Sequence, residues 1–398
     1  MHAHPPTGVR AIDRSALEVA DIVRAHGEAF VRTHVLLPEQ HAVLRDIARC
    51  RTAALGGHVD VCDDCGHVQV AYNSCRNRHC PKCQSLAQAR WIEGRMQRVL
   101  PTHAFHVVFT LPSELRGLAL QNREKIFNLL FASAADALLD LGRDPKWLGA
   151  QLGITSVLHT WTRDLRFHPH VHCVVTGGGL SPDGARWIAT RPGFLLPVRV
   201  LGALFRGKFL ARLVRLYDDG ALRLAGPASA LADRARFARL RDKLYRTRWV
   251  VYAKQPFGGP EQVFRYLGRY THRVGLSNRR LVSLDERGVT LRTHGDSTAI
   301  VAPDEFLRRL LLHVLPKGFV KIRHHGLMAP GNVSTRLAVA RRLLGDIPPA
   351  PPNDTPPHSF AELLLALTGV DIRRCPLCGG NVSRHPLALP PPIPPDTS

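Results

Sequence analysis

Residues 168–175 decide the fold, and they read His168-Pro-His170-Val171-His172-Cys173-Val174-Val175. Alternation that passes into β-branched residues is typical of a strand. Side chains two residues apart face the same side of a strand, so His170 and His172 are predicted to point to one spot while Val171 points into the opposite layer. Two imidazoles on one face can hold a metal ion.

Either of two further histidines can supply a third ligand. His159 lies eleven residues before His170, near the end of an apolar strand expected at 154–161, and pairing of the two strands would bring it to the same point. His168 precedes a proline, which favours extended backbone, and it would share the face of His170 and His172. We expect His159 to be the ligand, with His168 as its rival.

Around this strand, β-rich runs alternate with segments of helical period. Strands are expected at residues 103–110, 154–161, 171–176, 248–254, 281–284 and 289–292, and helices at 113–141, 201–216, 232–245, 260–272 and 304–314. Gly177-Gly178-Gly179 is interpreted as a turn after the histidine strand. The pattern predicts an α+β or α/β domain.

We expect this domain to span residues 101–345. Residues 1–100 hold most of the cysteines between expected helices at 39–50 and 85–100, and they are predicted to form a separate zinc-binding and DNA-binding domain. Residues 346–398 are rich in proline and are interpreted as a linker, a short element with a CxxC knuckle, and a tail.

Six of the nine cysteines lie between residues 50 and 83. Cys62-x-x-Cys65 and Cys80-x-x-Cys83 are 14 residues apart, close to the spacing of paired zinc knuckles, so these four are predicted to bind one zinc ion. Cys50, His58, Cys75 and His79 remain in the same window and could form a second zinc site.

Two features beside these cysteines stay open. The Cys375-x-x-Cys378 knuckle would need ligands from elsewhere to complete a site. Arg76, Arg78 and Lys82 lie between the ligands, where cations on a metal-pinned loop are suited to gripping a phosphate backbone. The alternative is that the zinc segment only staples the next domain.

A second constellation falls on the helix expected at 260–272. Arg265, Arg269 and Arg273 recur every four residues as a basic stripe, and Tyr266 and Tyr270 lie on the seam between it and the apolar face. A DNA phosphate held by the arginines would lie within reach of both hydroxyls, so the tyrosines are interpreted as nucleophiles. Packing at the edge of the core is the alternative.

The overall charge agrees with a polyanionic partner. Lys and Arg total 54 against 32 Asp and Glu, a net charge of +22, which favours nucleic acid. No apolar run is long enough for a membrane span and the start lacks the pattern of a signal peptide, so we expect a cytoplasmic protein with reduced cysteines and no membrane partner. No GxxxxGK[ST] loop occurs, and no nucleotide cofactor is expected.

Together these motifs resemble the HUH endonucleases, named for histidine, hydrophobic, histidine as in His170-Val171-His172. More narrowly, they resemble the two-tyrosine transposases of rolling-circle insertion sequences. The matching segments are Cys50-Arg-Thr, Asn73-Ser-Cys-Arg-Asn-Arg-His-Cys-Pro-Lys-Cys83, the histidine strand with its glycine run, Tyr266-Leu-Gly-Arg-Tyr270-Thr-His-Arg273, and Leu315-Pro-Lys-Gly-Phe-Val-Lys-Ile-Arg-His-His-Gly326.

The resemblance implies a central antiparallel sheet with flanking helices, preceded by a small zinc-binding domain. It implies a transposase that nicks and rejoins single-stranded DNA at the element ends through 5′-phosphotyrosine intermediates at Tyr266 and Tyr270. Mg or Mn would bind the histidine site, and zinc would be structural. Transposases of this class can take the third metal ligand from elsewhere, so Gln262 stays open beside His159.

The same resemblance bears on the basic segment near residue 320. Lys317, Lys321 and Arg323 would line the DNA channel, where cations follow the phosphate backbone. A solvated basic turn is the alternative for these three residues.

Two other functions remain to be weighed. A plasmid relaxase or rolling-circle replication initiator would use the same chemistry, but the zinc module and the specific motifs argue against it. A non-catalytic, zinc-dependent DNA-binding protein would use the tyrosines only for packing and would form no covalent adduct with DNA.

Overall fold

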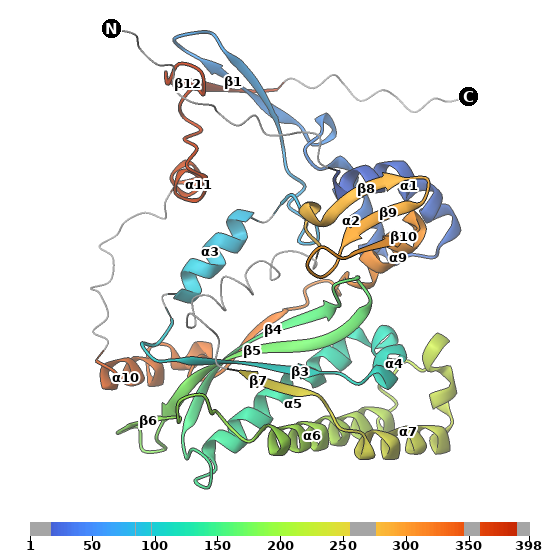
Figure 1. Ribbon diagram of the computed structural model, residues 1–398, viewed down its shortest axis with the longest axis vertical. Coiled ribbons are helices and arrows are strands. Elements are labelled where there is room, and N and C mark those ends of the chain that lie inside the picture. The colour runs from blue at the N-terminus through green and yellow to red at the C-terminus, as the bar shows by residue number, and fades with distance from the viewer. Residues whose placement is uncertain (1–16, 84, 97, 255–275, 346–358, 388–398) are drawn as a thin grey trace.

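The computed structural model describes residues 17–83, 85–96, 98–254, 276–345 and 359–387 (Figure 1). Its centre is a six-stranded antiparallel sheet in the order β11-β4-β5-β3-β7, with β6 pairing to β5 off this path. The predicted α+β class with a central antiparallel sheet is thereby confirmed. The strands are β3 (Ala104–Thr110), β4 (Gln151–Trp161), β5 (Phe167–Leu180), β6 (Trp187–Ala189), β7 (Val251–Lys254) and β11 (Ile322–Gly326).

One face of this sheet packs on helices and forms the main core. Phe105, Val107 and Phe109 of β3 and Val171 and Val175 of β5 point to that face and are at most 1% exposed. Burial of each such side chain stabilises the fold by about 1.5–3 kcal/mol. The covering helices are α4 (Arg116–Gln121), α5 (Arg123–Arg143), α6 (Val198–Asp218) and α7 (Arg234–Arg246), and Figure 1 draws α5, α6 and α7 below the sheet.

The other face of the sheet carries the alternate residues, including several histidines. The helix α3 (Ser85–Met96) lies on this side (Figure 1). Its Trp91 and Met96 pack against Ala104, Val157 and Val174. Successive side chains of β3, β4 and β5 therefore alternate between an apolar face covered by helices and a face that carries the histidines.

A second module joins the N-terminal helices to strands and a helix between residues 281 and 312. Val19, Ile22 and Phe30 share one core with Leu291 and Phe306, so the N-terminal helices have no separate core. The elements of this module are α1 (Val19–Thr33), α2 (Pro38–Arg49), β8 (Leu281–Asp285), β9 (Gly288–Arg292), β10 (Thr298–Val301) and α9 (Pro303–Leu312).

A third sheet, in the order β12-β1-β2, pairs the N-terminal region with the C-terminal one. β1 (Gly57–Cys62) forms a hairpin with β2 (Val68–Tyr72), and β12 (Val382–Pro386) pairs antiparallel with β1, with Cys62 opposite Val382. The segment interpreted as a tail thus supplies a strand to the zinc region.

The remaining helices connect these parts. Ser359 caps α11 (Phe360–Thr368) reciprocally with Glu362, and Gly369 ends it in the left-handed conformation. The other helical segments are α10 (Arg336–Leu343) and the 3-10 turns η1 (Ala53–Leu55), η2 (Ser113–Leu115), η3 (Gly226–Ala232), η4 (Asn278–Arg280) and η5 (Pro330–Asn332). Across the described ranges, no helix combines the length and apolarity that crossing a bilayer requires.

The glycine run corrects one expectation. Gly177, Gly178 and Gly179 do not form a turn but lie inside β5. They are glycines because neighbouring residues approach them too closely for a side chain. A Cβ on Gly178 would lie 2.6 Å from the carbonyl oxygen of Ile188, and one on Gly179 would lie 2.5 Å from that of Gln151.

This close approach predicts that Gly178→Ala lowers the free energy of unfolding by about 1–3 kcal/mol, since the backbone of β6 must move to admit the methyl group. Urea denaturation measures the change. Gly207→Ala in α6 is the control, because nothing lies within 4 Å of a Cβ there and alanine is the better helix former by about 0.5–1 kcal/mol. Equal stability of the two variants would contradict this account of the glycine run.

Candidate metal centres

Three histidines converge on the polar face of the central sheet. His159 of β4 lies opposite His170 of β5, and His172 follows two residues along. Ring centroids are 5.5 Å apart for His159 and His170, 4.9 Å for His170 and His172, and 4.2 Å for His159 and His172. One nitrogen from each lies within 4.8 Å of the others. We call these three residues the histidine cluster.

This spacing is close to what a shared ion requires. Nitrogen donors about 2.1 Å from a metal can be at most about 4.2 Å apart, so small side-chain rotations would bring all three onto one ion. The expected third ligand His159 is thus brought together with His170 and His172. The rival His168 is half-buried, and its Nδ1 lies 3.4 Å from Nη2 of Arg116. Gln262 lies outside the described residues.

Burial keeps the histidine cluster neutral. Burial lowers the pKa of His170 to about 4 and the pKa values of His159 and His172 well below the ordinary value. Nδ1 of His170 lies 2.7 Å from the carbonyl oxygen of His168, and it must donate because a carbonyl only accepts. The lone pair of His170 is therefore on Nε2, which can ligate a metal.

His106 of β3 is a functional candidate that the sequence reasoning missed. Its Nε2 lies 2.7 Å from Nδ1 of His172, and the two rings stack with centroids 4.9 Å apart. Such a hydrogen bond fixes the orientation of a ligand ring and leaves the other nitrogen for the metal. The sequence could have pointed to His106, because in the alternating run 103–110 it falls on the face opposite Phe105 and Val107.

The cysteines form two groups of four. The N-terminal cysteine cluster contains Cys50, Cys75, Cys80 and Cys83. Cys50 is the cap residue at the end of α2, and its sulfur lies 3.4 Å from that of Cys83 and 3.6 Å from that of Cys80. Hydrogen bonds from Cys50 and Cys75 lower the pKa of the Cys83 thiol, which favours the thiolate that a metal binds.

The knuckle cluster joins Cys62 and Cys65 to Cys375 and Cys378. The sulfurs of Cys62 and Cys378 are 3.4 Å apart, and those of Cys65 and Cys375 are 3.7 Å apart. A tetrahedron of sulfurs about 2.3 Å from zinc has edges of about 3.8 Å. Both cysteine clusters therefore fit a structural zinc ion.

This arrangement corrects the predicted ligand sets. Cys62 and Cys65 do not meet Cys80 and Cys83, because β12 carries the second knuckle to the end of β1. Cys50 and Cys75 complete the site of Cys80 and Cys83 instead.

The two histidines of the expected second zinc site lie outside both cysteine clusters. His58 lies 3.7 Å from a carboxylate oxygen of Asp60. His79 is buried, and its Nε2 accepts the backbone N–H of Leu315 at 3.4 Å while its Nδ1 lies 3.2 Å from Oδ1 of Asn77. Neither histidine is placed to ligate.

Several predicted DNA-contact residues serve the fold. Lys82 pairs with Glu18, and Arg78 donates to the carbonyl oxygen of Phe319. Burial lowers the pKa of Lys321 to about 7. Arg323 lies over the ring of Phe131 and donates to Asn128.

Lys321 is buried and Arg323 is half-buried, whereas Arg76 and Lys317 are exposed. Tyr266, Tyr270, Arg265, Arg269 and Arg273 lie outside the described residues.

The two cysteine clusters predict two bound zinc ions per chain. Cys62→Ser and Cys375→Ser should each leave one ion, because both substitutions break the knuckle cluster. The double variant Cys62→Ser, Cys375→Ser should also hold one ion, because the N-terminal cysteine cluster stays intact. Cys62→Ser combined with Cys80→Ser should hold none. Elemental analysis of purified protein gives these counts. Two ions in Cys375→Ser would restore the grouping first expected from the sequence.

A buried histidine predicts acid sensitivity. His313 bridges Thr160 and the carbonyl oxygen of Leu165, and burial lowers its pKa to about 4. An unfolded chain takes up this proton near pH 6.5. The stability that depends on neutral His313 is therefore full above pH 6.5 and lost as the pH falls towards 4, by about 2 kcal/mol between pH 7.5 and 5.

Urea denaturation at the two pH values tests this dependence. His313→Gln keeps a donor and an acceptor but cannot titrate, so it should lose less stability than the parent over the same interval. Any release of zinc by acid affects both proteins. Identical losses in parent and variant would exclude His313 as the source.

Two family matches cover most of the chain. Residues 22–111 match the family described as “Transposase zinc-binding domain”, and residues 153–336 match the family described as “Putative transposase”. The first match includes the N-terminal cysteine cluster and supports structural zinc. The second includes the histidine cluster, Tyr266 and Tyr270.

Similar proteins agree with these matches. The chain is 50% identical over 372 residues to “Putative transposase y4qJ” of Sinorhizobium fredii, covering 92% of this chain and 94% of that protein. It is 30% identical over 350 residues to “Transposase for insertion sequence element IS801” of Pseudomonas savastanoi pv. phaseolicola, covering 84% and 80%. No solved structure gives a significant match. The predicted resemblance to insertion-sequence transposases is confirmed, and the chain belongs to the family of DNA transposases that carry an N-terminal transposase zinc-binding domain.

Proposed function

We propose that this transposase nicks and rejoins single-stranded DNA at the ends of an insertion sequence, in rolling-circle transposition. The observation that carries the proposal is the histidine cluster, in which three neutral imidazoles meet on the polar face of the central sheet of a DNA transposase.

The histidine cluster suits a divalent ion with open coordination positions. His159, His170 and His172 would hold Mg or Mn; all-nitrogen ligation suits Mn better, while abundance in cells favours Mg. When bound, the ion would polarise an oxygen of the scissile phosphate. His106 would hold the ring of His172 in place, and the carbonyl oxygen of His168 would do the same for His170.

The nucleophiles of the proposed reaction are Tyr266 and Tyr270. The phenolic oxygen attacks phosphorus, a Tyr O–P bond forms, and the bond from phosphorus to the 3′ oxygen breaks. The phenol loses its proton, and the leaving oxygen takes one up to become a free 3′ hydroxyl, while the 5′ phosphate stays on the tyrosine. The new ester conserves the bond energy, so a 3′ hydroxyl can later displace the tyrosine without ATP.

The cationic residues have a supporting role in this proposal. Arg76, Lys317 and the stripe Arg265, Arg269 and Arg273 would contact the DNA backbone. The zinc ions would hold the N-terminal loops in position and would take no part in the chemistry, since four cysteines leave no open ligand position.

Covalent capture of DNA tests the proposal. Protein, labelled single-stranded DNA carrying the element ends, and Mn or Mg should give a labelled protein band on a denaturing gel. Tyr266→Phe with Tyr270→Phe should abolish it, and His170→Ala should reduce it at least 100-fold, because the nucleophile and the metal site are lost. Tyr72→Phe, which alters an exposed tyrosine of β2, is the control.

Three outcomes would contradict this function. A band that persists in the double tyrosine variant would remove the assigned nucleophiles. Absence of any band with the parent protein, with DNA binding intact, would favour a binding-only protein. Nicking of plasmid origins in preference to element ends would favour a replication initiator or relaxase.

A further inference from the structure

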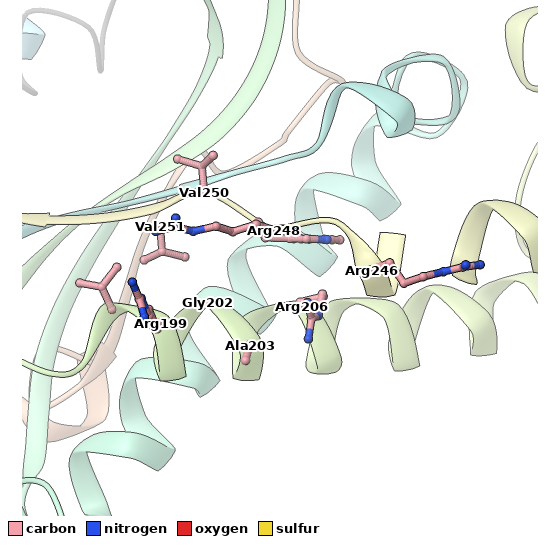
Figure 2. A pocket seen from close by; sticks show the side chains of 10 residues that line it. Arg199, Gly202, Ala203, Arg206, Arg246, Arg248, Val250 and Val251 are labelled. Carbon is pink, nitrogen blue, oxygen red and sulfur yellow. The ribbon is translucent and has the colours of Figure 1, made fainter. Parts of the chain in front are cut away.

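A pocket of about 540 Å³ lies at the edge of the central sheet, away from the histidine cluster. Its walls come from the first half of α6 and from the end of α7 and start of β7 (Figure 2). Four arginines line it, Arg199, Arg206, Arg246 and Arg248. We call it the arginine pocket.

The charges of the arginine pocket are not balanced by the part of the chain that the structure describes. Among the described residues, none of the four guanidinium groups forms an ion pair with a carboxylate. Asp242 on α7 pairs with Arg241 instead, and Glu114 pairs with Lys243. Nη1 of Arg206 donates only to the carbonyl oxygen of Thr247, at 3.4 Å.

Two further observations favour an anion here. Nε of Arg206 is buried and has no hydrogen-bond partner among the described residues, a state that costs about 1–3 kcal/mol unless a ligand accepts the bond. The pocket also adjoins the start of the 21-residue helix α6, whose first turn holds no acidic residue, so the helix dipole adds to the positive potential.

The size of the pocket leaves room for an extended anion. Gly202 and Ala203 occupy one wall of it and leave space that larger side chains would fill. A volume of 540 Å³ far exceeds the roughly 30 Å³ of one water and is more than a single phosphate needs. Val250 and Val251 add apolar surface for sugars or bases beside the phosphates.

The strand β7 runs from this pocket to His106, whose Nε2 lies 2.7 Å from Nδ1 of His172 in the histidine cluster. Val251, at its start, lines the pocket, and Lys254, at its end, pairs with His106 of β3. The distance along β7 is about 10 Å for three residues. The chain then continues from Lys254 to the segment that holds Tyr266 and Tyr270.

We propose that the arginine pocket binds the phosphodiester backbone of the DNA strand that flanks the cleaved bond. The inference rests on the proposed function, because it takes DNA bound at the histidine cluster as its starting point. Its contacts are to phosphates and therefore add affinity without reading sequence. An acidic segment of a protein partner is the competing ligand.

The first variant of the test adds one negative charge to the pocket and leaves the four arginines in place. Ala203 is exposed on α6, so Ala203→Glu should fold and would place a carboxylate among the guanidinium groups. Ala203→Gln has the same size and no charge. Arg215→Gln changes the net charge by the same amount as Ala203→Glu but lies about 18 Å further along the same helix.

Fluorescence anisotropy with a labelled 40-nucleotide single strand, in the zinc-loaded Tyr266→Phe, Tyr270→Phe protein with no Mg or Mn added, measures binding without cleavage. Ala203→Glu, and Arg199→Gln combined with Arg248→Gln, should raise the Kd at least tenfold. Loss of two phosphate contacts should lower the slope of log affinity against log salt by about 1.4. Ala203→Gln and Arg215→Gln should stay within twofold of the parent.

Equal DNA affinity and salt slope for Ala203→Glu and Ala203→Gln would overturn the proposal and leave the acidic protein segment as the better ligand. This result is independent of the covalent assay, because binding without added Mg or Mn needs neither the ion at the histidine cluster nor a tyrosine nucleophile. Loss of covalent capture with an intact pocket effect would instead reject the proposed chemistry alone. Circular dichroism melts confirm that each variant is folded.

Discussion

The antiparallel pairing of β4 with β5 is the constraint on which the site depends. One face of these strands is buried against α5 and its neighbours, so the register is fixed by the burial of Leu158, Val171 and Val175. A slip of one residue would turn the histidines into the apolar core and expose the valines. The meeting of His159 with His170 therefore follows from core packing and needs no ion to form it.

Sulfur ligands impose the other long-range constraint. The knuckle cluster joins Cys62 to Cys378, a separation of 316 residues, yet the entropy of closing a loop rises by only about 0.6 kcal/mol per doubling of its length. Zinc binding contributes about 10–16 kcal/mol in small zinc peptides, so distance along the chain hardly disfavours such a ligand set. In the β12-β1-β2 sheet, the side chains of Val68, Val70 and Tyr72 of β2 are exposed. Because the sheet buries so little apolar surface, zinc would be its main source of stability.

The sequence revealed local features well and pairings poorly. Alternation at 168–175 predicts the histidine strand, and CxxC spacing predicts zinc knuckles, because both signals lie within a few residues. Spacing cannot say which knuckle meets Cys62 and Cys65, since Cys80 with Cys83 and Cys375 with Cys378 offer identical chemistry. His106 was missed and Gly177–Gly179 was misread for the same reason: the contacts that explain them come from the partner strands of β5.

The sheet also separates two kinds of electrostatics. At the histidine cluster, a permanently charged side chain would cost several kcal/mol because the site is buried. Neutral imidazoles avoid that cost, and the positive charge would come only with a bound ion. The arginines of the pocket stay at the edge, where Arg199, Arg246 and Arg248 are exposed to water and repel one another only weakly. Water screens them, and in the proposed complex the DNA backbone would take its place. Permanent charge at the rim and neutral donors within the fold would thus allow the proposed metal site and the proposed DNA-binding edge to share one sheet at a low cost in stability.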